Sequence, residues 1–549
     1  MARTLLIFAI SLLFHPALQA QVFDEKFDVW PLQTTIIGTV VVAPQLNDLS
    51  VLKEAFRRLD EEVTVGLLTG SDVKAQDAAA MVEVFDRTRV KVQAVSPDSG
   101  IVETLSEWTE SCDVICLHTN RDTPNPLLEK AVAGLAGEFR GFVRRRNRLV
   151  LVGSIAQLAG KTKLVEPSSP APGFDFLPDA VMAKQAVSRE ALTKQLSANP
   201  GMVGVVVQPN TALVLGGRVA RVIGTGSAEF MLPAGRYHQE RTQVLRQPER
   251  RQRPPEFLVD WTEWRRDSID RSLPLFPPEL RQKPFVKSGT LLIVGGGGTP
   301  KGLMDRFVEL AGGPEDAKLV YVPCSEDQSV SPRQRMVSAW KQMGVKSATF
   351  IHTKDRTKAN TDEEFLAPLN EATGIWFGGG RQWNMADSYY GTEAHRLMKN
   401  VLNRGGVIGG SSAGASIQAR YLARATPIEN FRIMAPGYER GGLGFISGVA
   451  IDQHFSQRGR QEDMTQLVDR YPQLLGIGLD EATAIEVHQS TAKVTGRGKV
   501  FFYDRNRPVV EGEPDYVSLP SGSSYDLARR SIVLDATNVD EDTGEHSRQ

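Results

Sequence analysis

Short runs of apolar residues that end in glycine or proline set the strongest limit on how this chain can fold. In the second half, residues 290–294 run into four glycines, residues 319–322 into Pro323, and residues 374–377 into three more glycines. Longer amphipathic stretches separate the runs, a pattern typical of parallel strands covered by helices. Open sheets of this kind bind ligands at the carboxyl ends of their strands. We therefore expect the functional residues in the turns that follow the runs.

The first half has the same rhythm, and three of its segments resemble segments of the second half in the same order. The pairs are 150–156 with 407–413, 210–215 with 482–487, and 221–226 with 493–498. This order predicts a tandem duplication. Chance similarity between two unrelated α/β domains stays open, because buried strands look alike. The predicted fold class is α/β, with two tandem three-layer parallel-sheet domains of which the first is a degenerate copy.

A chain of 549 residues is long enough for several domains. We predict a signal peptide at 1–20, a non-catalytic α/β domain at 21–235, a linker at 236–284, and a catalytic domain with a polar tail at 285–549. The linker is Arg-rich and Pro-rich, and such segments rarely form a core. A solvated linker is favoured over contact with a polyanion.

The first twenty residues have the layout of a secretory signal peptide. Arg3 precedes the apolar run 5–14, and small residues follow at 17–20. The run is too short to span a bilayer. We expect cleavage after Ala20 and export to the periplasm or beyond, without stable membrane insertion afterwards; an uncleaved anchor is the alternative.

Composition excludes several classes of function. The net charge of −1 gives no broad field that would attract nucleic acid. Cys112, Cys116 and Cys324 are too few for a disulfide framework, and the first two lack a second pair with metal-ligand spacing. We expect packing cysteines and no metal site.

The segment around Ser412 fits the pattern G-x-S-x-G. Gly410 and Gly414 flank it, the apolar residues Val407 and Ile408 precede it, and a helix-compatible stretch follows. A strand, a tight turn and a helix are the context that a nucleophile elbow requires. The helix start also offers N–H donors to a developing oxyanion.

His454 is the candidate base for this serine. It ends an apolar segment, and two carboxylates, Asp480 and Glu481, follow the next apolar segment. A carboxylate at a strand end can orient an imidazole and stabilise its charged form. A histidine that caps a strand, or a pair of acids in a surface turn, would look the same from the sequence.

Three blocks at 409–416, 452–460 and 476–484 resemble the signature blocks of the cyanophycinases, which are serine peptidases related to the aspartyl dipeptidases. The resemblance covers roughly 285–503 and not the first half. It implies a class I glutamine amidotransferase-like fold and no cofactor. The roles that it implies are nucleophile Ser412, general base His454, orienting acid Glu481, oxyanion-hole donors Gly379 and Ala413, and substrate-pocket residues Gln382, Asp452, Gln453, Arg458 and Arg460.

Two positions depart from the pattern of that family. Asp463 stands where a third arginine is usual, and Arg381 stands where an acidic or amide residue is usual. In the first half, the aligned positions hold Ile155, Gln185 and Pro209, none of which can replace the triad. We therefore expect the first half to be dispensable for chemistry.

The sequence predicts an exported serine-type exopeptidase or omega-peptidase that hydrolyses β-aspartyl amide bonds. The resemblance implies a peptide or polyaspartate-type substrate such as cyanophycin. An α-aspartyl dipeptidase and a non-catalytic cell-surface binding protein are the alternatives. The run 295–298 lacks the Lys-Ser/Thr of a phosphate loop, so nucleotide binding is disfavoured. The oligomeric state, a homodimer included, is left open.

Overall fold

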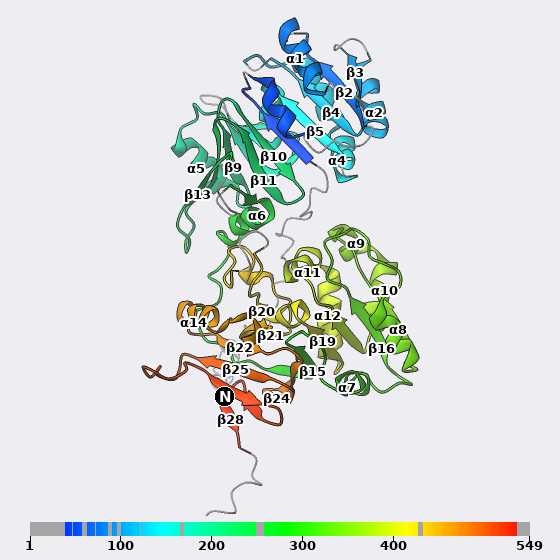
Figure 1. Cartoon of the computed structure of the whole chain (residues 1–549), viewed down its shortest axis with the longest axis vertical. Helices are drawn as coiled ribbons and strands as arrows, with labels where there is room; N and C mark the ends of the chain where they lie inside the picture. The colour runs from blue at the N-terminus through cyan, green and yellow to red at the C-terminus, as the bar shows by residue number, and fades with distance from the viewer. Residues whose placement is uncertain are drawn as a thin grey trace, which may run out of the picture.

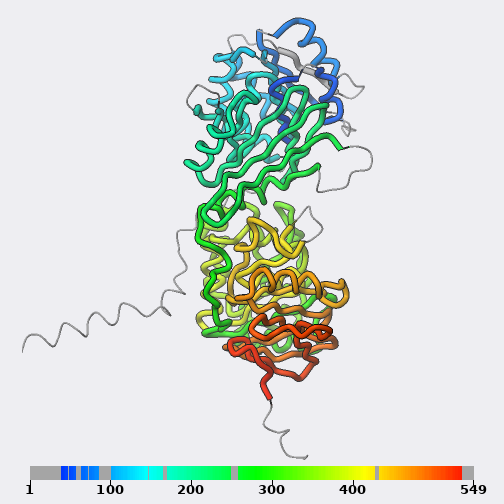
Figure 2. Tube along the Cα trace, turned by 90° about the vertical axis from the view of Figure 1, so that its left-hand side faces the viewer, coloured from blue at the N-terminus to red at the C-terminus, as the bar shows by residue number. Residues whose placement is uncertain are grey.

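The computed structural model describes residues 39–534 except 47, 57–62, 72, 86–89, 96–99, 121, 146, 165–169, 249–256 and 427–431. The expected signal peptide lies outside these residues. In the described part of the chain, no helix is long and apolar enough to cross a bilayer. The two halves are stacked along the long axis, with helix α6 (Trp261–Asp270) close to their junction (Figures 1 and 2).

The larger sheet of the C-terminal half has nine strands and mixed direction. Its first five strands are parallel, and the other four continue the sheet in antiparallel pairs. The prediction of a parallel sheet therefore holds only for the five strands on one side of this sheet, because the remaining strands run antiparallel to their neighbours. In spatial order the strands are β17 (Ser347–Phe350), β16 (Lys318–Val322), β18 (Gly374–Phe377), β19 (Val407–Ser411), β15 (Val286–Val294), β23 (Thr483–Gln489), β24 (Thr491–Gly496), β27 (Ser524–Asp526) and β28 (Ser531–Val533).

A second, five-stranded sheet of this half carries two of the predicted site residues at strand ends. It consists of β20 (Ala419–Tyr421), β21 (Ile446–Gln453), β22 (Leu475–Leu479), β25 (Lys499–Asp504) and β26 (Val517–Pro520). Strands β20, β21 and β22 are parallel, so β21 and β22 end at the same edge. His454 directly follows β21, and Asp480 and Glu481 directly follow β22.

The N-terminal half repeats this topology. Its larger sheet contains, in spatial order, β3 (Val90–Val95), β2 (Val63–Thr69), β4 (Val114–His118), β5 (Arg148–Val152), β1 (Thr39–Ala43), β10 (Thr211–Gly216), β11 (Val219–Gly224) and β14 (Val259–Asp260). The smaller sheet contains β7 (Ala171–Pro172), β6 (Gly160–Leu164), β8 (Leu177–Ala183), β9 (Val203–Val207), β12 (Ser227–Leu232) and β13 (Arg241–Arg246). Strand for strand, the larger sheet has the order and directions of β17 to β27 in the C-terminal sheet.

Backbone hydrogen bonds show which residues correspond in the two halves. The N–H of Gly153 donates to the carbonyl of Ala43 at 3.0 Å, as the N–H of Ser412 donates to the carbonyl of Val294 at 3.0 Å. The counterpart of Ser412 is therefore Gly153, and the alignment with Ile155 was wrong by two residues. Short buried strands carry too little side-chain information to fix such a register.

The alignment of the other two triad positions agrees with the backbone. The N–H of Asn210 donates to the carbonyl of Gln45 at 2.8 Å, as that of Ala482 donates to Gly296 at 2.7 Å. Pro209 thus occupies the place of Glu481. The pairing of β8 with β9 and of β21 with β22 then places Gln185 at the position of His454.

The segment 236–284, expected to be a linker, holds secondary structure. Strand β13 pairs with β12 along its whole length, and every residue of α6 is buried. Charged residues of α6 are buried because they are paired: Arg241 reaches Glu263 at 2.9 Å and Asp267 at 2.8 Å. Composition alone did not reveal these partners. The domain boundaries remain predictions.

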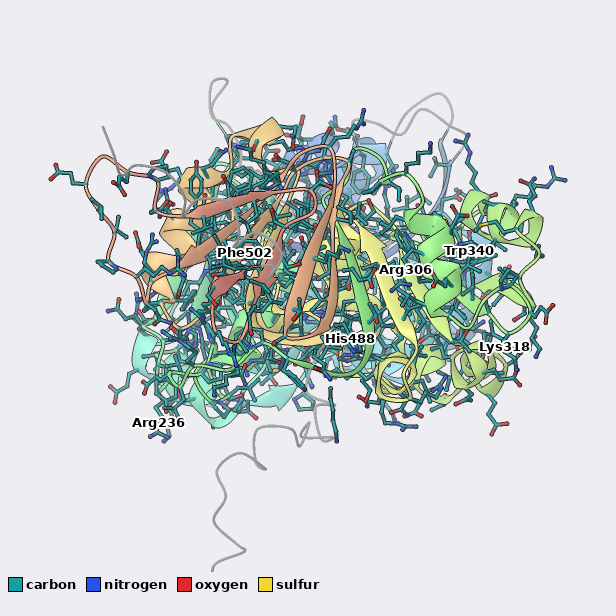
Figure 3. All side chains as sticks on the ribbon, turned by 90° about the horizontal axis from the view of Figure 1, so that it is seen from below. Arg236, Arg306, Lys318, Trp340, His488 and Phe502 are labelled. Carbon is teal, nitrogen blue, oxygen red and sulfur yellow. The ribbon has the colours of Figure 1, made fainter. Side chains whose placement is uncertain are left out.

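Helices cover the sheets of both halves. In the N-terminal half they are α1 (Ala75–Phe85), α2 (Ile101–Ser111), α3 (Pro126–Gly134), α4 (Ala136–Arg144) and α5 (Arg189–Ala198). In the C-terminal half they are α7 (Leu303–Leu310), α8 (Arg335–Gln342), α9 (Arg356–Thr361), α10 (Glu363–Glu371), α11 (Gln382–Tyr389), α12 (Glu393–Asn403), α13 (Ala413–Ser416) and α14 (Gln461–Arg470). The rings of Trp340 and Phe307 stack with their centroids 5.6 Å apart. On the other side of this half, the rings of Phe502 and Tyr525 stack with their centroids 4.0 Å apart (Figure 3).

Candidate active site

Ser412 occupies a strained turn between β19 and α13. Its φ of 58° and ψ of −115° are unusual for a residue with a side chain, and strain of this kind gathers at functional sites. The turn needs small neighbours, because a Cβ at Gly410 would lie 2.2 Å from the carbonyl oxygen of Gly414. The predicted elbow geometry is therefore present.

The three predicted triad side chains form one hydrogen-bonded chain. The Oγ of Ser412 lies 2.9 Å from Nε2 of His454, and Nδ1 of His454 lies 2.6 Å from Oε1 of Glu481. With Nδ1 protonated, His454 donates to Glu481 and accepts from the serine hydroxyl. The other candidate acid, Asp480, is used differently, since its two oxygens accept the backbone N–H groups of Ser456 and Lys499 at 3.0 Å each.

The imidazole of His454 is held in its neutral form. Burial lowers its pKa below the ordinary value, the hydrogen bond with Glu481 raises it, and the positive charge of Arg458 lowers it again. The net direction is down. A neutral imidazole at neutral pH can accept the proton of a serine hydroxyl.

The glycine run that follows β15 packs directly against His454 and Glu481, a role that the sequence analysis missed. A Cβ at Gly296 would lie 2.4 Å from Cε1 of His454, and a Cβ at Gly297 would lie 2.4 Å from the carboxyl carbon of Glu481. The carbonyl of Gly295 accepts the N–H of His454 at 2.8 Å. A run of glycines at a strand end signals close approach of another group, and here that group is the triad.

The two predicted oxyanion donors flank the serine. Ala413 is the first residue of α13, where N–H groups lack intrahelical partners. Gly379 lies in the turn after β18, and a Cβ there would be 3.5 Å from Cβ of Ser412. Both N–H groups therefore belong to backbone next to the nucleophile.

Gln382, predicted to line the pocket, is buried at the start of α11. Its Nε2 donates to the carbonyls of Ala423 and Arg424 at 2.8 Å each. The side chain therefore ties α11 to the segment after β20.

Beside this contact lies a cluster of alternating charges centred on Arg424, a residue that the sequence analysis did not single out. Arg424 pairs with Asp452 at 2.7 Å and with Asp463 at 2.6 Å. Arg460 pairs with the second oxygen of Asp452 at 2.9 Å and donates to the carbonyl of Gln453 at 2.6 Å. Arg424 was missed because it lies at no strand end.

The cluster divides the predicted pocket residues into two groups. Asp452 and Arg460 are buried and paired with each other, whereas Arg458 is exposed and close enough to lower the pKa of His454. Asp463 remains 43% exposed although it pairs with Arg424. Among the residues that the structure describes, Oε1 of Gln453 is buried without a hydrogen-bond partner.

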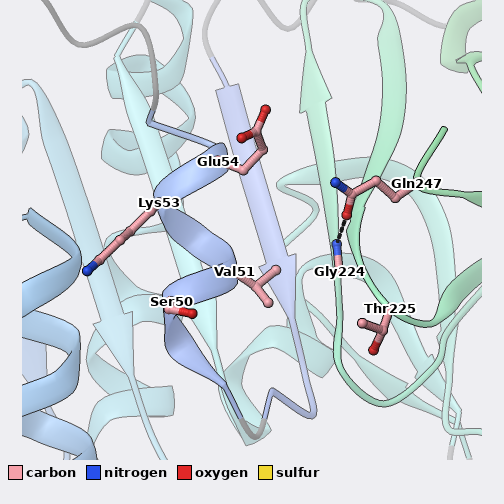
Figure 4. Close-up of a pocket in the computed structure, with 7 residues that line it drawn as sticks. All are labelled: Ser50, Val51, Lys53, Glu54, Gly224, Thr225 and Gln247. Atoms are coloured by element: carbon pink, nitrogen blue, oxygen red, sulfur yellow. Dashed lines mark hydrogen bonds between the residues drawn. The ribbon is translucent and has the colours of Figure 1, made fainter. Parts of the chain in front are cut away.

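A separate hollow of about 400 Å³ lies in the N-terminal half (Figure 4). It is lined by Ser50, Val51, Lys53, Glu54, Gly224, Thr225 and Gln247. The N–H of Gly224 donates to Oε1 of Gln247 across its rim at 2.8 Å. No His/Cys/Asp/Glu group in the described ranges is arranged to hold a metal ion.

A strained serine joined through a histidine to a carboxylate is the arrangement of serine hydrolases. Residues 291–495 match the model of peptidase family S51. The resemblance predicted from the sequence is thus confirmed, and the C-terminal half carries a peptidase family S51 domain.

Known proteins similar to this chain include two curated cyanophycinases. That of Geminocystis herdmanii (strain PCC 6308) is 28% identical over 226 residues, 40% of this chain and 82% of that protein. That of Synechococcus elongatus is 28% identical over 209 residues, 37% of this chain and 63% of that protein. The crystal structure of a peptidase from an acI-B1 Actinobacterium has 22% identity and a TM-score of 0.33, and its match covers 45% of this chain and 98% of that one.

Proposed function

We propose that this protein is a serine-type hydrolase that cleaves β-aspartyl amide bonds through an acyl-enzyme. The single observation that carries the proposal is the unbroken hydrogen-bonded chain from Ser412 through His454 to Glu481. The similar cyanophycinases support the choice of bond.

In this mechanism Ser412 Oγ attacks the carbonyl carbon while its proton moves to Nε2 of His454. The N–H groups of Gly379 and Ala413 stabilise the tetrahedral oxyanion. His454 then gives the proton to the leaving amine, and water, activated by the same imidazole, releases the acid. General base catalysis contributes roughly 10²–10⁴-fold and one oxyanion donor roughly 10²–10³-fold. The reaction therefore needs no cofactor.

The charged groups near the triad favour a substrate with a free carboxylate. Arg458 is exposed beside His454 and can form a charge-assisted bidentate contact with the α-carboxylate of a β-linked aspartyl residue. The half-exposed Asp463 can accept a guanidinium, as in a β-aspartyl-arginine unit of cyanophycin.

The N-terminal half is, in this proposal, a degenerate copy of the catalytic domain. The matching strand orders support a duplication, and Gly153, Gln185 and Pro209 leave it without nucleophile, base or acid. The leader-like first twenty residues support export.

The deciding experiment compares hydrolysis of β-Asp-Arg and α-Asp-Arg by the purified full chain, with released arginine as the readout. We expect a higher kcat/KM for the β-linked peptide. A preference for the α-linked peptide would favour the α-aspartyl dipeptidase instead. Turnover of neither peptide, together with tight binding of one, would favour a binding protein.

A further inference from the structure

Two arginines of the N-terminal half meet one buried carboxylate of the C-terminal half. Asp387, on α11, accepts Nη2 of Arg266 at 2.7 Å and Nη1 of Arg218 at 3.2 Å. The hydroxyl of Tyr438 also donates to Asp387, at 2.9 Å. The side chains of Arg266 and Asp387 are 0% and 4% exposed. The halves are therefore joined through charges that are largely or fully buried.

The backbone packs equally closely at this junction. A Cβ at Gly437 would lie 2.6 Å from the N of Asp267 and 2.8 Å from the carbonyl oxygen of Glu263, both in α6. A second pair, Arg440 with Asp270 at 3.1 Å, joins α6 to the C-terminal half beyond α11. Helix α6 thus contacts the C-terminal half through Asp387 on α11 and through Gly437 and Arg440, which lie outside α11.

Helix α11 is the direct continuation of the oxyanion turn. Gly379 lies against Ser412, and α11 begins three residues later at Gln382. A displacement of α11 therefore moves the N–H of Gly379 relative to the nucleophile. Such donors act only when they are held within hydrogen-bond distance of the developing charge.

Burial alone would raise the pKa of Asp387, but Arg266, Arg218 and Lys354, with the hydrogen bond from Tyr438, outweigh it and lower the pKa. The carboxylate therefore stays ionised inside the protein. A buried carboxylate that loses its cations is strongly unfavourable, so the helix that carries it must move towards water or open the junction.

We propose that Arg266 and Arg218 are positioning residues that hold α11, and with it the oxyanion turn, in its working position. This inference rests on the proposed function, because it takes Gly379 as an oxyanion donor. The N-terminal half is then a required part of the catalytic unit, contrary to the expectation that it is dispensable. Within the C-terminal half, Lys354 and Arg356 also bind backbone carbonyls of α11, at 3.1 and 3.2 Å. The experiment must therefore show that these two contacts alone do not hold α11 in its working position.

The test uses full-chain Asp387→Asn and, as the matched control, Asp270→Asn. Each variant removes one buried carboxylate that pairs across the same junction, but only Asp387 lies on α11. The readout is the second-order rate of labelling by a fluorophosphonate. Ser412 Oγ bonds to phosphorus, fluoride leaves, the proton goes to His454, and the phosphoryl oxygen takes the oxyanion position.

We expect both variants to lower Tm, and Asp387→Asn alone to slow labelling by about tenfold or more, as expected for a displaced oxyanion donor. The control should stay within about threefold of the wild type, because the partner of Asp270 is Arg440, which lies outside α11. Equal rates in both variants would overturn the inference and leave only a structural role for the junction.

Tyr438→Phe serves if Asp387→Asn does not fold. It removes the hydroxyl that donates to Asp387 and accepts from Nη2 of Arg218, and it keeps the ring. We therefore expect a smaller decrease in labelling rate and in Tm than for Asp387→Asn; an unchanged rate would overturn the inference. Labelling does not depend on aspartyl specificity. A wild-type Ser412 that fails to react would overturn the proposed function as well, whereas a reactive wild type with unaffected variants overturns only this inference.

Discussion

Gly296 lies directly against the imidazole of His454. A Cβ built on this glycine would be 2.4 Å from Cε1 and 2.5 Å from Nε2 of that ring. The φ of Gly296 is +94°, a conformation that residues with side chains rarely adopt. The backbone after β15 and the base after β21 therefore share a space that admits no side chain.

We predict that Gly296→Ala lowers kcat/KM by about 100-fold, because displacement of a catalytic group by about 1 Å has an effect of this size. Gly298→Ala is the matched control. Gly298 also has a positive φ, +127°, but a Cβ there would meet nothing closer than 3.8 Å. Both variants therefore strain the backbone, but only Gly296→Ala adds a clash with the imidazole of His454. Equal losses in the two would show that strain alone matters.

Ser412→Ala should reduce hydrolysis by at least about three orders of magnitude and change the free energy of unfolding by about 1 kcal/mol or less. The nucleophile is lost, while the scaffold around the elbow is unchanged. Steady-state kinetics and thermal unfolding measure the two effects. Substantial remaining activity, or fluorophosphonate labelling at the neighbouring Ser411, would contradict the assignment.

Replacing Glu481 and Asp480 each by its amide should have different effects on kcat and Tm. Glu481→Gln should lower kcat by about 10³–10⁴-fold, because an amide no longer holds the imidazole in the correct tautomer. Asp480→Asn should mainly lower Tm, since both oxygens of Asp480 hold backbone N–H groups. A larger loss of kcat in Asp480→Asn would reverse the assignment of the acid.

The pH dependence of labelling should follow His454. Its pKa lies below the ordinary value of 6.5, so the active, neutral imidazole predominates at pH 7 and is lost as the pH falls through that lowered pKa. Arg458→Gln removes a positive charge that lowers this pKa, and the acidic limb should therefore move to higher pH. Lys341→Gln, on the exposed surface of α8, is the control for a general charge effect. An unchanged limb in Arg458→Gln would contradict this electrostatic coupling.

The sequence predicted Ser412, His454 and Glu481 as a triad because each follows a buried strand. The structure places Ser412 after β19 of the larger sheet, and His454 and Glu481 after β21 and β22 of the smaller sheet. The sequence did not locate Arg424 or Asp387, because neither lies at a strand end and each was identified only by its partners in space. The register of Gly153 was missed for a related reason. Apolar runs predict that a strand exists, but which of its residues pair is decided by the neighbouring strands.

The final prediction concerns the two arginines that follow the base, which the sequence alone treated as equivalent. Arg460 is buried and shared between Asp452 and the carbonyl of Gln453, so it has little freedom to reach a substrate. Arg458 is exposed beside His454. We therefore expect Arg458→Ala to raise KM for β-Asp-Arg by about tenfold or more with a smaller change in kcat, as for a lost charge-assisted contact.

Arg460→Ala, in contrast, should lower Tm and kcat together, because it leaves the buried carboxylate of Asp452 with one cation fewer. The comparison is made with β-Asp-Arg and α-Asp-Arg, since only the β-linked peptide offers a free α-carboxylate next to the scissile amide. If Arg458 grips that carboxylate, Arg458→Ala should reduce the preference for the β-linked peptide. If kcat/KM falls by the same factor for both peptides, Arg458 acts through the effect of its charge on His454 and not through the substrate. The source of the linkage preference must then lie elsewhere, and Asp463 with its partner Arg424 is the next pair to test.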